Sequence, residues 1–418
     1  MLRGGISRIL TGSLIGQGVL LAVSPLLTRL YQPTDFAALT VFTALATVTG
    51  SLITLSWDRA IVIPRSEIQA LSVATLGLIT VVALGIGLTI AAYLVGPTID
   101  EVFGTRVFAP LWWLLPSTVV AMGIYSLLSS WLVRLKHYGR IAARNALQGV
   151  TQAISSVVLG LAGAGVFGLV SGMGVGRAVS LVGVMPWATF RGPHRQSWVR
   201  ISATARRFRR FPLVATWSRA FNVVGLQLPP VLIVAIYGTW EAGLYALTVR
   251  VLATPVGIVT DAVSHYFEGI FAERVRMRSR RLRSVILMIS GRLLLLSIVP
   301  AFVIAIFGPA MFAFVFGEEW RLAGTFAQLV VALYVAQFVV SPISRALLVL
   351  ERQFAQLAWD IARMILTTFA VVFPMLVGAT LGLALALLAC TQVLLYGGLL
   401  ILCLRAARRA EFLGVRNG

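Results

Sequence analysis

The sequence predicts an all-α polytopic membrane protein with about twelve transmembrane helices in two pseudo-symmetric six-helix bundles around a central cationic cavity. Three observations predict this fold. Of the 418 residues, 59% are hydrophobic and only 12% are charged, whereas about a quarter of a soluble domain is charged. The basic residues gather at every second connection between apolar runs. The two halves of the chain also share landmarks at equivalent connections.

Twelve apolar runs are long enough to cross a bilayer, which takes about 20 residues per helix. The first run follows Arg3 and Arg8, and no small-residue cleavage site follows it, so we read it as a transmembrane helix and not as a removable signal. The runs lie near residues 9–29, 36–57, 69–95, 108–133, 142–163, 166–189, 212–236, 242–267, 285–315, 322–350, 355–377 and 379–404.

The distribution of basic residues predicts the orientation of the chain. One set of connections holds 26 of the 35 basic residues, whereas the opposite set holds Arg29, Arg106 and Arg321 alone. The larger set includes Arg134, Lys136, Arg140 and Arg144 after the fourth run, and seven arginines between 191 and 210. Since basic loops stay in the cytoplasm, we expect both termini to be cytoplasmic.

An internal repeat predicts the domain organisation. Tyr31 to Asp35 follows the first run and Tyr237 to Glu241 follows the seventh, and Gly96-Pro97 matches Gly308-Pro309 around a later connection. The spacing of six runs is even, so both halves would have one orientation. We expect an N-terminal lobe over 1–190, a basic cytoplasmic linker over 191–211, a C-terminal lobe over 212–404 and a basic cytoplasmic tail over 405–418.

Several functional classes lack their motifs. The sequence has no phosphate-binding GxxxxGK[ST] loop, no HExxH metal motif and no GxSxG nucleophile elbow. Its two cysteines, Cys390 and Cys403, are too few to build a metal site. We therefore expect no metal and no cofactor. The arginines near 206–210 are interpreted as a juxtamembrane segment that contacts anionic lipid, and not as a nucleic-acid site.

Charged residues inside the predicted helices indicate a functional interior. A charge at the centre of a membrane helix costs about 2.5–3.5 kcal/mol, yet six arginines fall there and few acids balance them. The surplus positive charge suits an anionic substrate. Those arginines are Arg177, Arg219, Arg250, Arg292, Arg345 and Arg363.

The eighth run is the most informative, because Arg250, Thr254, Gly257, Asp261 and Glu268 share one helical face. Arg250 would hold an anion, and Asp261 would take a proton or a cation. The alternative is an ion pair that only braces the bundle.

Further polar residues lie at helical spacing in other runs. They are candidates to line the cavity, although each could equally serve as a hydrogen bond between helices. In contrast, Asp360 and Arg363 are expected to neutralise each other. The cavity candidates are Gln17, Asn145, Gln148, Asn222, Gln337 and Ser341.

The order of several segments resembles bacterial polysaccharide flippases of the O-antigen type, in the multidrug/oligosaccharidyl-lipid/polysaccharide exporter superfamily. The resemblance runs through most of the chain and depends on the ensemble, since no single segment is unique. It departs from the family at Ala37, where a glycine is usual. The segments are Tyr31–Phe36, Asp58–Arg65, Gly243–Val251 with Pro255, Phe316–Trp320 and Val340–Ser344.

The resemblance implies movement of a prenyl-pyrophosphate-linked oligosaccharide across the bacterial inner membrane by alternating access. Such movement changes no covalent bond, so we expect no catalytic residues. Arg250 matches the embedded basic residues that meet the pyrophosphate in that family, and the polar stripes add Arg219 and Arg345. Expected partners are the lipid-linked oligosaccharide and membrane lipids, with a polysaccharide polymerase and glycosyltransferases as candidates; a monomer is the candidate assembly.

Two other functions stay open. A cation-coupled drug exporter of the same superfamily would have acids dominating its cavity, whereas arginines dominate here. A membrane-embedded glycan polymerase or ligase needs a substantial outer loop, and the outer loops span only a few to about a dozen residues.

Overall fold

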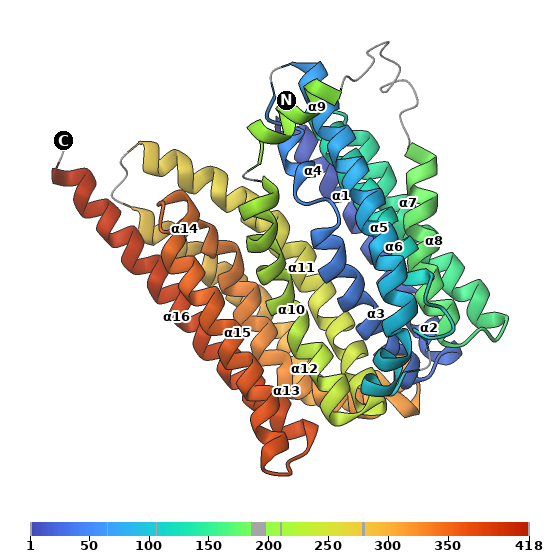
Figure 1. Ribbon diagram of the computed structural model, residues 1–418. Coiled ribbons are helices and arrows are strands. Elements are labelled where there is room, and N and C mark those ends of the chain that lie inside the picture. Colours follow the sequence, from blue (N-terminus) through green and yellow to red (C-terminus); the bar gives the residue numbers. More distant parts are fainter. Residues whose placement is uncertain are drawn as a thin grey trace. The chain divides into compact units, whose positions relative to one another are not determined.

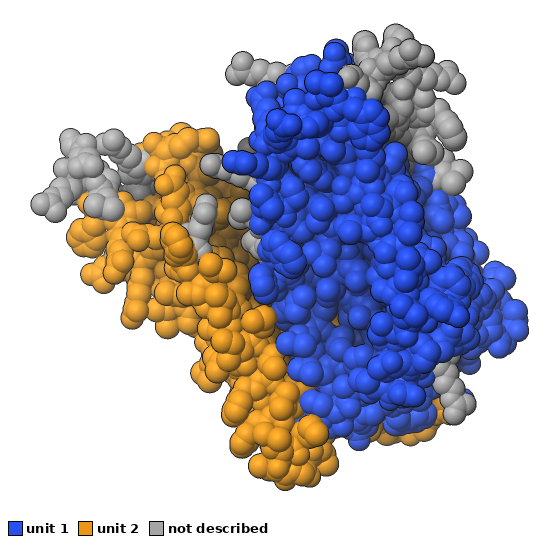
Figure 2. Space-filling view, viewed as in Figure 1, with its two compact units in different colours: residues 1–243 blue, residues 244–418 orange. Residues whose placement is uncertain are grey.

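The computed structural model describes residues 2–64, 66–105, 107–184, 198–209, 211–277 and 281–416, and all of its regular elements there are helices (Figure 1). Helices satisfy every backbone group within the segment, which a bilayer requires. By contacts the chain divides into two compact units, residues 1–243 and 244–418, coloured separately in Figure 2.

Unit 1 contains the first ten α-helices and a π-helical turn over Phe211–Ala215. The α-helices are α1 (Leu2–Ala22), α2 (Ser24–Leu30), α3 (Pro33–Leu52), α4 (Trp57–Ala60), α5 (Glu67–Phe103), α6 (Leu114–Arg134), α7 (Tyr138–Leu161), α8 (Val166–Val184), α9 (Trp198–Arg207) and α10 (Thr216–Tyr237). Helix α3 lies at the centre of this unit and packs against α6, α8 and α10. Its small and apolar residues Ala37, Val41, Phe42 and Ala46 are buried.

Unit 2 begins within α11 (Thr239–Arg276). It continues with α12 (Leu282–Phe316), α13 (Arg321–Val340), α14 (Arg345–Val349), α15 (Gln353–Leu376) and α16 (Leu381–Arg416), and with 3₁₀ turns over Glu318–Trp320 and Ser341–Ser344. Helix α13 is its central element and packs against α12 and α16.

The predicted all-helical membrane fold is confirmed. Ten helical segments in the described part of the chain are long and apolar enough to cross a bilayer, and Val166–Leu181 of α8 is a shorter apolar helix. Large apolar side chains are exposed along α5 and α12, among them Leu94 and Leu295. Exposed apolar residues along such helices are what a protein surrounded by lipid needs.

The structure adds detail to the predicted repeat. The Gly-Pro pairs lie inside α5 and α12, and each helix ends about two turns later at a phenylalanine followed by a glycine with positive φ, Gly104 (φ 60°) or Gly317 (φ 110°). A Cβ at Gly96 would lie 2.8 Å from the carbonyl oxygen of Phe108, and one at Gly308 would lie 2.7 Å from that of Gly324. Both glycines therefore permit close packing at the same place in each half.

The predicted domain boundaries stay a prediction. Helix α10, which the sequence assigns to the C-terminal lobe, packs against α3 within unit 1. In the predicted linker, residues 198–207 form α9, whereas residues 191–197 lie outside the described part of the chain. The predicted tail continues α16 as helix up to Arg416.

Candidate functional site

A buried carboxylate joins three helices of unit 1. Asp58 on α4 accepts hydrogen bonds from the Thr54 hydroxyl at 2.8 Å, the Ser126 hydroxyl at 2.7 Å and the Arg219 guanidinium at 3.2 Å. Its side chain is 7% exposed and that of Arg219 is 26% exposed. Buried charges are tolerated when they are paired and hydrogen-bonded. Asp58 therefore ties α4 to α6 and α10, with Arg219 as its counter-ion.

A break in the helix places this carboxylate. Leu55 and Ser56 have φ of 43° and 57°, in a left-handed region that costs most residues about 1–3 kcal/mol. The break separates α3 from α4, and Thr216 of α10 donates a hydrogen bond of 3.2 Å to the Ser56 hydroxyl. Interrupted membrane helices are tolerated where neighbouring groups satisfy the freed backbone.

A second polar cluster in unit 1 centres on Arg144 of α7, which is 2% exposed. Its guanidinium lies 3.7 Å from the centre of the Tyr125 ring and donates to the Asn145 side-chain oxygen at 3.3 Å. The Tyr125 hydroxyl donates to the same oxygen at 2.5 Å, and the Asn145 amide donates to the Ser13 hydroxyl at 3.0 Å. This set is called the Arg144 cluster below.

A second arginine, Arg177, lies on α8, which packs against α7, the helix that carries Arg144. The Nε atoms of Arg144 and Arg177 are buried without a hydrogen-bond partner in the described part of the chain. Neither arginine forms an ion pair with an acid among the described residues. The cluster is therefore a buried cationic site with unused donors.

Close packing of α1 on α7 brings the members of this cluster together. A Cβ on Gly12 would lie 2.2 Å from the carbonyl oxygen of Ala142, and one on Gly149 would lie 2.3 Å from the Gly16 backbone. Only glycine allows the two backbones this distance, as in other membrane helix pairs with small residues at the contact. The hydroxyl of Ser13 can therefore reach Asn145.

The predicted polar residues of unit 1 have different environments. Asn145 belongs to the Arg144 cluster, Gln148 is half-buried on the next turn of α7, and Gln17 is exposed. The side chain of Asn222 lies outside the described residues. Sequence reasoning counted Arg144 as a loop arginine and overlooked its burial, because a basic residue two turns inside a helix looks like a topology signal.

In unit 2 the predicted stripe lies on α11 as expected. Arg250 is half-buried and Asp261 is exposed. The two residues are 11 positions apart, which is about 16 Å along a helix, so their side chains do not pair. Farther along, Glu268 lies 4.0 Å from Arg345 of α14.

The other predicted stripe of unit 2 is not straight. Gln337 is half-buried near the end of α13, but Ser341 begins a 3₁₀ turn that contains Pro342. A 3₁₀ turn has 3.0 residues per turn, so Arg345 does not continue the face that Gln337 begins. The Arg345 side chain is 43% exposed.

The predicted pairing of Asp360 with Arg363 is confirmed at 3.5 Å. The guanidinium of Arg363 also lies 5.0 Å from the centre of the Trp359 ring, whose indole donates to the Leu395 carbonyl at 2.8 Å. This arginine is thus accounted for by packing of α15 on α16.

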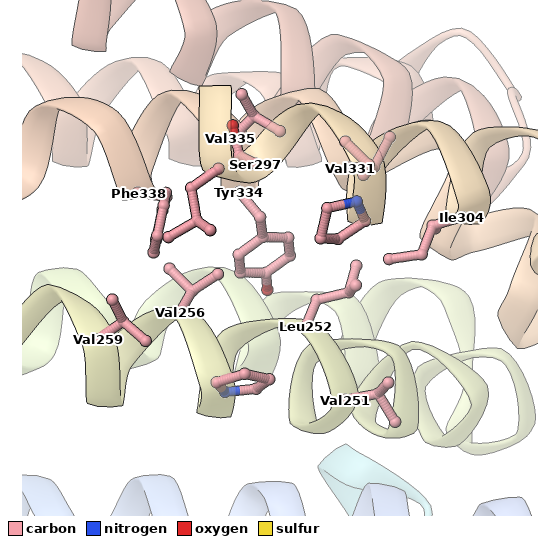
Figure 3. A pocket seen from close by; sticks show the side chains of 14 residues that line it. Val251, Leu252, Val256, Val259, Ser297, Ile304, Val331, Tyr334, Val335 and Phe338 are labelled. Atoms are coloured by element: carbon pink, nitrogen blue, oxygen red, sulfur yellow. The ribbon is translucent and has the colours of Figure 1, made fainter. Parts of the chain in front are cut away.

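An apolar cavity of about 310 Å³ lies among α11, α12 and α13 in unit 2. Figure 3 shows Leu252 and Val256 on one wall and Val335 on the opposite wall, with the Tyr334 hydroxyl directed between them. Tyr334 and Ser297 are the two polar residues in a lining of 14. This cavity was not predicted from the sequence, because apolar residues in membrane helices have the same composition whether they face lipid, core or cavity.

Comparisons with known proteins agree with this architecture. A family model described as "Polysaccharide biosynthesis protein" matches residues 26–324. Among solved structures, the lipid II flippase MurJ in an inward closed conformation is similar with a TM-score of 0.73 at 12% identity, covering 98% of this chain and 90% of that one. An inward-facing multidrug resistance MATE family transporter of the MOP superfamily has a TM-score of 0.69 at 14% identity, covering 97% and 96%. No curated protein sequence matches the chain.

Proposed function

Because this chain belongs to the polysaccharide biosynthesis protein family, we propose that it moves a prenyl-pyrophosphate-linked oligosaccharide across the bacterial inner membrane by alternating access. The observation that carries the proposal is the Arg144 cluster, where the buried Arg144 and the half-buried Arg177 have no acidic partner in the described part of unit 1. A bilayer about 30 Å thick in its hydrocarbon core is a barrier to a pyrophosphate but not to a prenyl chain. The protein therefore needs to carry only the polar head.

Arginine suits this cargo. Its guanidinium is always charged, and its fork of donors matches phosphate oxygens. The buried Nε atoms of Arg144 and Arg177 are donors that a phosphate or an acidic sugar would satisfy. Arg250 on α11 is the proposed contact in unit 2, and the exposed Arg345 is a weaker candidate. Arg219 is proposed to act together with its counter-ion Asp58, because the Asp58 carboxylate already neutralises the charge of Arg219.

Coupling is assigned to Asp261. Its carboxylate is exposed and has no ion pair in the described part of the chain, so it is available to a proton or sodium ion. Asp58 and Asp360 are less suited, since each already pairs with an arginine. We propose no covalent step, so none of these residues is assigned a catalytic role.

The acids also argue against the rival drug exporter. A cationic drug would need acids to dominate the interior, whereas Asp58 and Asp360 each pair with an arginine and only Asp261 of these three is without an ion pair in the described part of the chain. A glycan polymerase or ligase would need an outer domain for an acceptor. The connection between α10 and α11 is the single residue Gly238, and that between α7 and α8 spans 162–165.

The cargo can be identified in the host. We would delete the gene and analyse prenyl-pyrophosphate lipids by mass spectrometry. The proposal predicts accumulation of one lipid-linked oligosaccharide that the wild-type gene removes and Arg144→Ala/Arg177→Ala does not. The matched control is Arg274→Ala/Arg276→Ala near the end of α11, which removes two arginines outside the cluster. An unchanged lipid pool with an intact surface glycan would contradict the proposal and favour the drug exporter.

A further inference from the structure

The end of unit 1 at which α5 begins carries a second cavity, separate from the Arg144 cluster. Its volume is about 950 Å³. One wall comes from α9, and the other comes from the segment after α4 and the first turn of α5, which packs against α9. The lining residues are Ile63, Pro64, Ser66, Ile68, Gln69, Arg200, Ala203, Thr204, Arg207 and Phe208.

The wall opposite α9 is held in place by α6. Arg134, at the end of α6, donates to the carbonyl oxygen of Pro64 at 2.6 Å and to that of Ile61 at 3.2 Å. These are charge-assisted bonds to backbone groups, which are stronger than neutral ones. The cavity is therefore preformed on this side.

Helix α9 divides into three faces. Ile201 and Thr204, with Phe208 just after the helix, are buried against the rest of unit 1. At 100° per residue, Arg200 and Arg207 lie together on the flank that lines the cavity. Arg206 and Arg209 lie on the opposite flank and do not line it.

The two cavity arginines are available to a ligand. Both are exposed, and neither forms an ion pair in the described part of the chain. The guanidinium of Arg207 lies 5.5 Å from the centre of the Phe208 ring. Glu67 is in the adjoining turn of α5 but does not line the cavity. The chemistry of the lining thus favours an anion.

Exposed apolar side chains in the first turn of α9 and on the cavity wall indicate that this anion belongs to a lipid. Trp198 and Val199 of α9 are 74% and 80% exposed, and Ile63 on the opposite wall is 55% exposed. A basic helix with exposed tryptophan and aliphatic residues is typical of a segment that lies in the membrane interface. Tryptophan is enriched at that depth, beside the headgroups.

We propose that this cavity binds the phosphate headgroup of an anionic glycerophospholipid, held between Arg200 and Arg207, while Ile63 and Ile68 of the lining contact its acyl region. The ligand is a lipid of the surrounding bilayer and not the transported glycan. The site would anchor α9, and with it the segment that precedes α10, to the membrane. This inference does not depend on the proposed function.

Native mass spectrometry of the full-length protein in detergent, titrated with dioleoylphosphatidylglycerol, tests the proposal. An arginine near an anionic surface contributes about a factor of five in affinity, so Arg200→Ala/Arg207→Ala should weaken binding about 30-fold. The matched control Arg206→Ala/Arg209→Ala removes the same charge from the opposite flank and should change binding less than about threefold. Dioleoylphosphatidylcholine should bind weakly to all three proteins.

Two further measurements separate a built site from general attraction. Ala203→Trp places a bulky side chain in the lining between Arg200 and Arg207 without changing the charge, and it should also weaken phosphatidylglycerol binding. Inorganic phosphate should not displace the lipid. Equal weakening by both arginine pairs would overturn the proposal in favour of diffuse electrostatics. Displacement by inorganic phosphate would overturn it in favour of a soluble phosphate ligand.

Discussion

The guanidinium of Arg219 on α10 donates a hydrogen bond of 3.2 Å to the carboxylate of Asp58 on α4, although 161 residues separate them in the sequence. The pair is the one ion pair between distant segments of unit 1 in the described part of the chain. It fixes the residues after the break at Leu55 and Ser56 to the helix that begins the second repeat.

Removing one partner of this pair should destabilise the protein. Breaking a buried pair costs about 3–5 kcal/mol because it leaves an unpaired charge, and the partial exposure of Arg219 reduces that cost. We expect Arg219→Ala to lower the free energy of unfolding by about 2 kcal/mol, measured as thermal stability in detergent.

Adding Asp58→Asn to Arg219→Ala should restore part of the lost free energy of unfolding, because the neutral amide needs no counter-ion. A double-mutant cycle should give a coupling energy of about 1–2 kcal/mol between the two positions. Strictly additive effects of Arg219→Ala and Asp58→Asn would show that the contact contributes nothing to stability.

The Arg144 cluster predicts separate effects on charge and on geometry. Arg144→Lys keeps the charge but loses the planar fork of donors, whereas Arg144→Ala removes both. We expect transport to fall about tenfold or more with Arg144→Ala and less with Arg144→Lys, because charged hydrogen bonds contribute about 1.5–3 kcal/mol. Complementation of a deletion strain, scored by lipid accumulation, measures this order. Full complementation by Arg144→Ala at wild-type expression would refute the assignment.

The contact between α1 and α7 predicts a glycine effect that depends on position. Gly16→Ala would place a Cβ 2.5 Å from the carbonyl oxygen of Asn145, whereas nothing lies within 4 Å of a Cβ at Gly18. Overpacking costs about 1–3 kcal/mol, so Gly16→Ala should lower thermal stability and Gly18→Ala should not. Similar melting temperatures for both variants would argue against close packing here.

Tyr31 predicts a pH-dependent contribution to stability. Tyr31 lies between α2 and α3, outside the spanning segments. Its hydroxyl donates a hydrogen bond of 2.6 Å to the carbonyl oxygen of Ser156. Burial, with a smaller effect of the Asp35 charge, raises the pKa of Tyr31 from 10.0 to about 12. The folded protein therefore favours the neutral hydroxyl, and this contribution is complete below pH 10 and lost as the pH rises towards 12.

The comparison of wild type with Tyr31→Phe isolates this group. We expect Tyr31→Phe to lose about 1 kcal/mol at neutral pH, with a constant difference in melting temperature up to about pH 10 and a smaller one above it. A difference that already changes between pH 7 and pH 9 would show that another group is responsible.

The membrane helices were predictable because a bilayer permits few alternatives to long apolar helices. The pairing of Asp360 with Arg363 was also predictable, since residues three apart on a helix are neighbours. The position of Arg345 relative to Gln337 was less predictable. Their spacing assumes a continuous α-helix, whereas Pro342 lies in a 3₁₀ turn between them. The pairing of Asp58 with Arg219 depends on tertiary packing, which spacing along the sequence does not report.

Direct transport measurement tests the central claim that buried and half-buried arginines carry an anionic lipid-linked glycan. The cargo lipid purified from the deletion strain and labelled with a fluorophore on its glycan would be placed in liposomes with the wild-type protein, Arg250→Ala or the control Arg276→Ala. An impermeant quencher then reports the fraction of label that reaches the outer leaflet. We predict that the label becomes accessible to the quencher with the wild type and with Arg276→Ala. With Arg250→Ala, the rate of label transfer to the outer leaflet should be about 10- to 100-fold lower. Equal rates for all three proteins, or no transport by the wild type, would contradict the account.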